Sequence, residues 1–289
     1  MNPRALPALA LVFNAFTWGL SWWPFRQLQA AGLHPLWLTT ITFSVAVLGL
    51  LLARPRALAE VLRTPTLWVL LVASGTTNAC FNWAVSIGDV VRVVLLFYLM
   101  PLWAVLLARP LLGERIGGQA LARVALALGG AVVVLWPASG STLAPFGLAD
   151  ALGVAGGFSF ALNNVMLRRE AHRSEPARAL AMFAGGVLIS LLLAALQTQA
   201  GLIPAPPPLA AGWLLASVGL ALWFVLSNLG LQYGAARLPS HRTSVIMLTE
   251  VLFASASAVA LGAGVLDWRT ALGGGLIISA ALLAAWQRG

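Results

Sequence analysis

Apolar runs of about twenty residues, separated by short breaks, recur along the whole sequence. A helix needs roughly 20 apolar residues to cross a bilayer, and ten such runs lie between turn and charge signals. We predict a transmembrane helix for each run, at 7–27, 35–53, 66–87, 91–112, 118–136, 147–168, 177–198, 210–233, 241–263 and 268–286. No break is long enough for a soluble domain, so the predicted fold is all-α and integral to a membrane.

The arginines gather in alternate breaks between these runs. Of the 17 basic residues, all arginines, only Arg26, Arg92 and Arg269 fall on one side of the predicted membrane. Cytoplasmic loops carry the excess of positive charge in membrane proteins. The arginine-rich side is therefore predicted to be cytoplasmic, and with it both termini.

Composition narrows the function. The chain is 60% hydrophobic and 9% charged, whereas a soluble domain carries roughly 25% charged residues. Its net charge of +9 would suggest nucleic acid in a soluble protein, but such binding needs a continuous basic face. We therefore expect the lipid bilayer, and no nucleic acid, as a partner. The single Cys80 offers no disulfide framework or metal site, and is expected to be a small buried hydrophobe.

The two halves of the sequence can be laid over one another at an offset of about 149–150 residues. Asn82-Trp83-Ala84 then falls on Gln232-Tyr233-Gly234, and Pro101 falls on Glu250 or its neighbour. Five spans per half is an odd number, so the second half must cross the membrane in the opposite sense. We predict two inverted five-helix repeats, 1–137 and 138–289. In transporters of this kind the solute site lies near the midplane, where the repeats meet.

Three features of the sequence form a recognisable set of motifs: Trp18-Gly19, the stretch from Pro101-Leu102-Trp103 to Leu112-Gly113-Glu114, and the glycines of the fifth and tenth predicted spans. These motifs resemble those of the drug/metabolite transporter superfamily with paired EamA domains. Within the superfamily, the aromatic content is most similar to YddG-type aromatic amino acid exporters. The resemblance implies a secondary transporter of a bacterial inner membrane. The second half departs from the pattern, because Gly262 is followed by Ala263 rather than an acid.

Amide and aromatic side chains recur at helical spacing inside four predicted spans. Polar groups are costly in hydrocarbon, so they mark the inner face of a helix bundle. One interpretation is that the amides only hydrogen-bond between helices; the recurrence on four helices favours a shared cavity instead. The candidate substrate-binding residues are Asn14, Trp18 and Trp22 in the first span, Asn78 and Asn82 in the third, Phe160, Asn163 and Asn164 in the sixth, and Phe224, Asn228 and Gln232 in the eighth.

Four further candidates lie in the fourth and ninth spans: Tyr98, Pro101 and Met247 for substrate binding, and Glu250. Pro101 removes a backbone hydrogen bond to Phe97, so it is expected to bend its helix and let Tyr98 reach a solute. Pro24 could bend the first span in the same way. Glu250, on a face with Met247, is the only acid predicted deep within a span. It is a candidate proton or cation coupling site, or a neutral structural acid.

The acids nearer the predicted helix ends are expected to be ordinary hydrated flanks. Asp150 and Glu114 belong to this group.

Together these features predict export of small amphipathic metabolites by alternating access. Amides suit an ammonium and a carboxylate, and aromatic faces attract cations and apolar rings, so an aromatic amino acid fits best. The alternatives are a multidrug or cationic compound exporter, a non-transporting membrane sensor, and an intramembrane enzyme. An enzyme is disfavoured because His34, His172 and His241 all fall at predicted span ends. We expect no cofactor and no metal, and expect the chain to act as a monomer.

Overall fold

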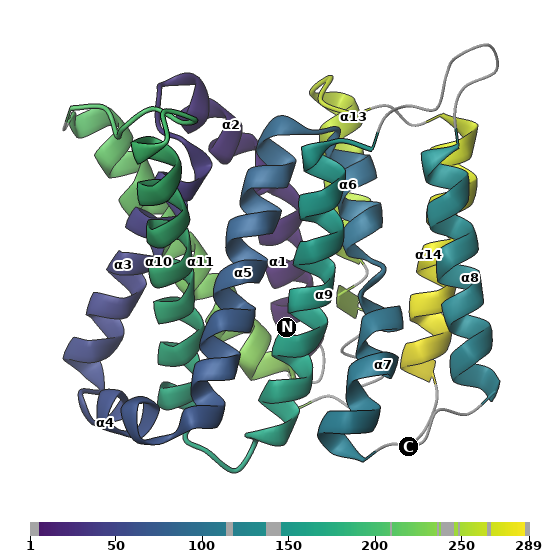
Figure 1. Cartoon of the computed structure of the whole chain (residues 1–289), viewed down its shortest axis with the longest axis horizontal. Helices are drawn as coiled ribbons and strands as arrows, with labels where there is room; N and C mark the ends of the chain where they lie inside the picture. Colours follow the sequence, from purple (N-terminus) through teal and green to yellow (C-terminus); the bar gives the residue numbers. More distant parts are fainter. Residues whose placement is uncertain are drawn as a thin grey trace.

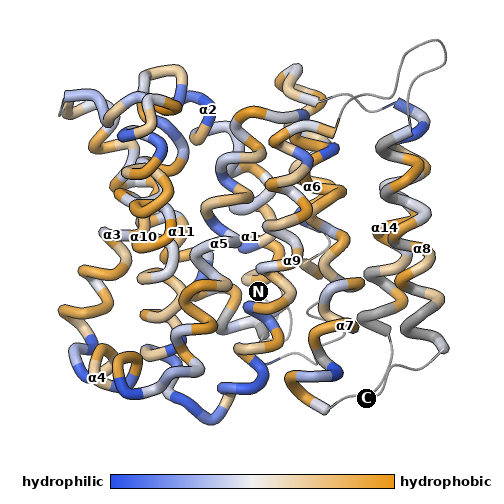
Figure 2. Tube along the Cα trace, in the orientation of Figure 1, coloured by the Kyte–Doolittle hydropathy of each residue, from blue (hydrophilic) through white to orange (hydrophobic). Residues whose placement is uncertain are grey.

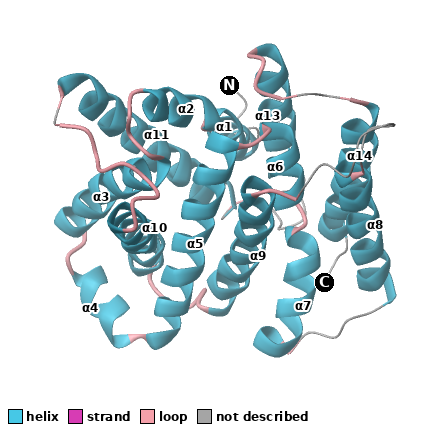
Figure 3. Ribbon diagram, turned by 45° about the horizontal axis from the view of Figure 1, so that its top comes forward, coloured by secondary structure: helices cyan, strands magenta, loops and turns pink. Residues whose placement is uncertain are grey.

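A computed structural model of the chain describes residues 6–113, 118–136, 146–208, 210–235, 237, 246–247, 249–264 and 267–286. Within these residues the protein is built from helices, without a strand (Figures 1 and 3). The helices are α1 (Leu6–Leu20), α2 (Trp22–Ala30), α3 (Pro35–Ala53), α4 (Arg56–Arg63), α5 (Pro65–Ile87), α6 (Val90–Phe97), α7 (Met100–Leu112), α8 (Gly118–Leu135), α9 (Leu148–Arg169), α10 (Glu175–Gln199), α11 (Ala211–Ala235), α13 (Thr249–Ala260) and α14 (Trp268–Trp286).

The helices follow the predicted spans closely. Seven of them, α3, α5, α8, α9, α10, α11 and α14, begin and end within two residues of a predicted span. Judged by length and apolar composition, three described helices can cross a membrane: Pro35–Ala53, Glu175–Gln199 and Ala211–Leu231. A fourth is added if α4 and α5 form one broken span. The all-helical membrane fold is thus confirmed, while the count of ten spans and the inverted repeat stay predictions.

Two predicted spans are broken, each just before a proline. The first divides into α1 and α2 at Ser21, and the fourth divides into α6 and α7 at Tyr98 and Leu99. Pro24 and Pro101 lack the N–H that would bond to the carbonyl four residues earlier, which frees a carbonyl in each helix. At the first break the Ser21 hydroxyl donates to the Trp18 carbonyl at 2.8 Å. The helix that carries Pro101 is thus interrupted just before this residue, while the bend expected there stays a prediction.

The helices pack in matched pairs. The helix α9 packs against α5 and against α6 and α7, and α1 correspondingly packs against α11 and α13. The helices α3 and α10 contact one another, as do α8 and α14, which stand at one edge of the bundle (Figure 1). Exchanging first-half spans for second-half spans at the predicted offset converts the α9 pairs into the α1 pairs, and it converts the α3–α10 and α8–α14 pairs into themselves. Two related halves would produce this pattern.

Hydrophilic segments concentrate at the two ends of the helices, and apolar segments lie between them (Figure 2). One end carries α4, the last turn of α7, the last turn of α9 and the start of α10. The opposite end carries α2 and the first turns of α6, α9 and α14. This division separates Arg26, Arg92 and Arg269 from the other described arginines, as the alternation in the sequence predicted.

Glycines bring helix backbones into direct contact. Gly75 of α5 faces Gly185 of α10, and a Cβ on Gly185 would overlap the carbonyl oxygen of Leu71. In the same way, a Cβ on Gly130 of α8 would lie 2.6 Å from the carbonyl oxygen of Gly273 on α14. Small residues commonly allow membrane helices to approach this closely. The α5–α10 and α8–α14 contacts therefore require these positions to lack side chains.

We expect the Gly185→Ala substitution to destabilise the fold, because the added methyl group must push α10 away from Leu71. Overpacking of this kind costs about 1–3 kcal/mol. Gly49→Ala is the matched control, since a Cβ at Gly49 meets nothing within 4 Å and alanine favours a helix by about 1 kcal/mol. In thermal unfolding of the detergent-solubilised protein, only Gly185→Ala should have a lower midpoint than the wild-type protein. Equal midpoints would contradict the proposed packing.

Candidate functional site

Five aromatic rings from both predicted halves pack against one another. The Trp18 ring of α1 stacks on the Phe224 ring of α11, with centroids 4.7 Å apart and planes at 11°. Trp18 also meets the Phe81 ring of α5 edge-on, at 6.5 Å. Phe81 contacts Phe97 at 4.9 Å, and Phe97 contacts Phe160 at 5.3 Å. These are the separations at which aromatic pairs attract, and we call the five residues the aromatic cluster.

The Trp18-Gly19 pair fixes α1 to two second-half helices at once. Trp18 points to α11, as described above. Gly19 faces α13 so closely that a Cβ there would lie 2.9 Å from the carbonyl oxygen of Glu250. One turn further, the Trp22 indole donates to the Ser257 hydroxyl of α13 at 3.0 Å. Gly19 therefore sets the spacing between α1 and α13, and Trp22, the first residue of α2, ties that helix to α13.

The acid predicted within the ninth span pairs with a tyrosine from the first half. Tyr98 lies in the break between α6 and α7, and its hydroxyl donates to the Glu250 carboxylate at 3.2 Å. The same hydroxyl lies 3.5 Å from the carbonyl oxygen of Met247. Tyr98 is 3% exposed and Glu250 is 9% exposed. Glu250 also sits in the first turn of α13, where the helix dipole favours a carboxylate.

Among the described residues, no basic side chain forms an ion pair with Glu250; its side chain has only a hydrogen-bond partner there. A buried carboxylate usually needs a positive partner or neutralisation by a proton. Glu250 is therefore suited to hold either a proton or a cation. Tyr98 contacts the aromatic cluster through Phe97, whose ring centroid is 6.1 Å from its own, so the Tyr98–Glu250 pair and the cluster are contiguous.

Several of the predicted amides join helices. Asn14 of α1 donates to the backbone carbonyl and hydroxyl of Ser227 on α11, at 2.9 and 2.7 Å. Asn82 of α5 donates to the Thr39 hydroxyl of α3 at 3.0 Å. Asn78 instead donates within its own helix, to the carbonyl of Ser74 at 2.8 Å. The alternative interpretation, interhelical bonding, thus accounts for the amide N–H groups of Asn14 and Asn82.

Three buried side-chain amide oxygens lack a hydrogen-bond partner among the described residues. They are Oδ1 of Asn14, Asn82 and Asn163. Buried acceptors in proteins nearly always have a partner, either protein or water. Asn163 donates to the Oδ1 of Asn164 at 3.4 Å, and the side chain of Asn164 is exposed. These oxygens are available to an ammonium, a hydroxyl or water.

The remaining candidates lie less clearly at the site. Asn228 is half-buried on α11, four residues after Phe224. The side chains of Pro101 and Gln232 are outside the described part of the structure. Sequence reasoning missed Phe81 and Phe97, which connect the predicted aromatic residues. Both directly precede a residue that was selected, Asn82 and Tyr98, so the aromatic content of the same stretches was the available signal.

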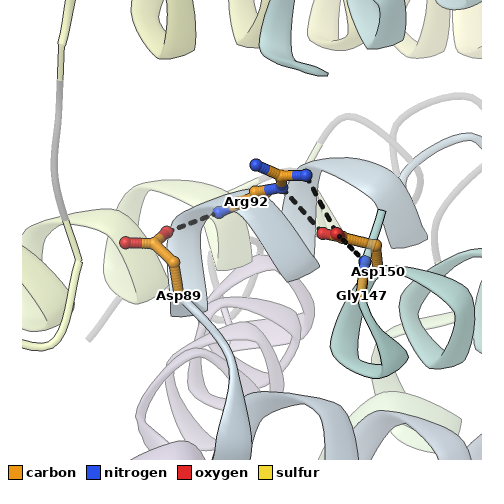
Figure 4. A network of polar contacts seen from close by, with 4 residues as sticks. All are labelled: Asp89, Arg92, Gly147 and Asp150. Carbon is orange, nitrogen blue, oxygen red and sulfur yellow. Dashed lines mark hydrogen bonds and ion pairs between the residues drawn. The ribbon is translucent and has the colours of Figure 1, made fainter. Parts of the chain in front are cut away.

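A charged network joins the halves at the helix end that carries α2. The Arg92 guanidinium of α6 makes two hydrogen bonds to the Asp150 carboxylate of α9, at 2.7 and 2.9 Å (Figure 4). Asp150 also accepts from the Gly147 amide at 2.9 Å, and Asp89 accepts from the Arg92 amide at 2.8 Å. Both aspartates therefore cap the start of a helix. The prediction that Asp150 is a hydrated flank is wrong, because Arg92 reaches it across the helix pair and only 6% of it is exposed.

An open pocket of about 770 Å³ lies at the same end. The Arg26 guanidinium, which donates to the carbonyls of Val85 and Gly88, forms part of its wall. Asp89, Ser86 and the segment 262–264 complete much of the lining. The pocket is an opening of mixed polar and apolar lining at the end of the bundle, and no residue of the aromatic cluster lines it.

One protein-family model matches the first half of the chain. Residues 5–136 match the EamA-like transporter family. The match includes Trp18-Gly19, Asn82, Tyr98 and Pro101. It supports the resemblance to the drug/metabolite transporter superfamily for this half, and with it a membrane transporter. Paired EamA domains and the likeness to aromatic amino acid exporters stay predictions.

Solved structures match the whole chain in fold. Fifteen chains match, among them one titled "Crystal structure of protein". It covers 96% of this chain and 96% of its own length, with 21% identity and a TM-score of 0.62. At that identity the likeness extends to the fold alone. No curated protein matches the chain.

We expect Asp150→Asn to lower the thermal midpoint, because Arg92 would keep its position at the helix pair without a charged acceptor. Charge-assisted hydrogen bonds contribute about 1.5–3 kcal/mol; partial exposure of Arg92 favours the lower end. Asp267→Asn is the control, since its ion pair with Arg269 is long, at 3.7 Å, and 41% of its side chain is exposed. A shift of similar size in both variants would show that the network adds nothing specific.

Proposed function

We propose that this protein is a secondary transporter that exports small amphipathic metabolites, with aromatic amino acids as the best-fitting class. It works by alternating access through a site between its two halves. Its place is the inner membrane of a bacterium, with both termini in the cytoplasm. The EamA-like match of residues 5–136 supports transport, and the arginine distribution supports the orientation.

The main observation in support of the proposed solute class is that the aromatic cluster lies next to the Tyr98–Glu250 pair. Trp18 and Phe224 come from opposite halves, as do Tyr98 and Glu250. A solute that separates these contacts would touch both halves. Alternating access requires a site of this kind, because the solute must bias the position of one half relative to the other.

The separation of the contacting residues supports the position of the site. Tyr98 and Met247 are in contact and lie 149 residues apart in the chain. This separation equals the offset at which the two halves align. In an inverted repeat, a residue contacts its own equivalent only near the pseudo-two-fold axis. The Tyr98–Glu250 pair therefore fits a location at the centre of the molecule.

The chemistry of the site suits an aromatic zwitterion. The ring of the solute would take over part of the stacking between Trp18 and Phe224. Its ammonium would replace the Tyr98 hydroxyl at Glu250, or use the open amide oxygens of Asn82 and Asn163. A proton on Glu250 would compete with the ammonium. Proton binding and solute binding would then alternate, which couples export to proton entry.

A multidrug or cationic compound exporter is the second candidate. It is favoured by a buried carboxylate that, among the described residues, has no basic partner, and by the aromatic rings beside it. Aromatic faces and a carboxylate together attract organic cations. The two candidates differ in whether a solute carboxylate is needed.

We expect Glu250→Gln to reduce proton-driven efflux at least about tenfold, because glutamine keeps the hydrogen bond to Tyr98 but cannot exchange a proton. A loss of about 1.5 kcal/mol, typical of one charge-assisted contact, corresponds to this factor. The measurement is efflux of labelled phenylalanine from proteoliposomes, with and without a proton gradient. A labelled organic cation is tested in parallel.

Two further variants make the result specific. Glu60→Gln removes an acid from the arginine-rich end and should transport normally. Asn14→Ala should lower thermal stability through loss of the Ser227 contact. If the wild-type protein exports neither solute, transport is overturned as the function. Normal coupling in Glu250→Gln would overturn the coupling role and leave transport intact.

A further inference from the structure

The short helix α4 runs across the end of the bundle, at a sharp angle to the helix that follows it. It meets α5 at an angle of 100° after a break at Thr64. It lies at the arginine-rich end, beside the start of α10 (Figure 1). A helix at this angle to a membrane-crossing helix runs along the membrane surface. This is the position of an interfacial amphipathic helix.

The surface of α4 divides into three strips. Ala57 and Val61 are buried against the bundle, at 4% and 5% exposure. Leu58 and Leu62 are exposed on a second strip, at 44% and 60%. At about 100° per residue, the strip of Arg56 and Arg63 lies about 130° around the helix from those leucines. The exposed leucines and the arginines thus face different surroundings.

Two contacts hold α4 in this orientation. The Ser174 hydroxyl and amide at the start of α10 both donate to the Glu60 carboxylate. The Ser174 hydroxyl hydrogen bond, aided by the nearby Arg173, holds the pKa of Glu60 below its ordinary value. Glu60 is therefore charged at neutral pH and remains bonded to α10, and α4 keeps its arginines turned outward.

A tryptophan marks the depth of the membrane surface beside α4. The Trp68 indole of α5 donates to the Val61 carbonyl, at 2.9 Å, and half of the residue is exposed. Tryptophan concentrates at the boundary between hydrocarbon and headgroups. Its hydrogen bond to the last turn of α4 therefore puts α4 at the level of the headgroups.

The arginines of this segment have no acidic partner among the described residues. Arg54, Arg56 and Arg63 are exposed, and none of the three forms an ion pair with another described side chain. The one acid on α4, Glu60, is engaged by Ser174. The segment thus presents a net positive strip next to an apolar strip.

We propose that α4, with Arg54, binds the headgroups of anionic phospholipids in the adjoining leaflet. Leu58 and Leu62 insert into the acyl region, and Arg56 and Arg63 contact the lipid phosphates. Arginine forms paired hydrogen bonds with phosphate, and basic residues on an interfacial helix select anionic lipids. The exposed leucines distinguish this surface from a binding site for a soluble acidic protein, which would leave them in water.

The test measures lipids bound to the intact protein. Protein reconstituted in nanodiscs of phosphatidylcholine and phosphatidylglycerol is extracted gently, and the retained lipids are counted by native mass spectrometry. We expect the wild-type protein to be enriched in phosphatidylglycerol. In the Arg56→Gln/Arg63→Gln protein the phosphatidylglycerol enrichment should fall at least about fivefold, which is the effect of one arginine near an anionic surface.

Two matched variants separate the site from general charge. Arg109→Gln/Arg237→Gln removes the same charge from exposed positions of the same end, away from α4, and should keep the enrichment. Arg56→Lys/Arg63→Lys keeps the charge and should retain most of the enrichment. This variant also controls for misfolding. Equal losses in the two glutamine variants, or no enrichment in the wild-type protein, would overturn the proposal. So would enrichment that survives in Arg56→Gln/Arg63→Gln.

Discussion

The bundle depends on close backbone contact between helices, because lipid chains are as apolar as the side chains they meet. Burial of leucine or valine therefore gives little preference for one helix neighbour over another in a membrane. Shape and hydrogen bonds must provide it. Gly75 and Gly185 supply the shape between α5 and α10, and Gly19 supplies it between α1 and α13. Asn14, Asn82 and Trp22 supply hydrogen bonds across other pairs.

The same constraint positions the candidate site. Since Gly19 allows α13 to approach α1, Glu250 is brought beside the first half, within reach of Tyr98. The break before Pro101 leaves Tyr98 outside a regular helix, so its ring is free to turn toward α13. One missing Cβ and one missing N–H thus create a polar contact between the halves.

Sequence reasoning predicted the helices well, because a membrane span needs a fixed length of apolar chain. Seven helices agree within two residues. It named Pro24 as a residue that could bend the first span, but it did not predict a break at Ser21, because a proline near a helix end is often tolerated. It also misjudged Asp150, which resembled a hydrated end residue. Its burial depends on Arg92 from a helix 58 residues away in the chain, and spacing within one helix contains no such information.

The candidate site was predictable by residue type but not by partner. Helical spacing selected Trp18 and Phe224, and its depth within a span selected Glu250. In the structure Phe81 and Phe97, which were not selected, connect the stacked Trp18 and Phe224 rings to the Tyr98–Glu250 pair. The amides illustrate the limit. Helical spacing predicts that the side chains of Asn14 and Asn82 point into the bundle. A hydrogen bond between helices and a contact with a solute both require this orientation. Each of these amides performs the first role with its N–H group and leaves its oxygen open, so one side chain can serve both.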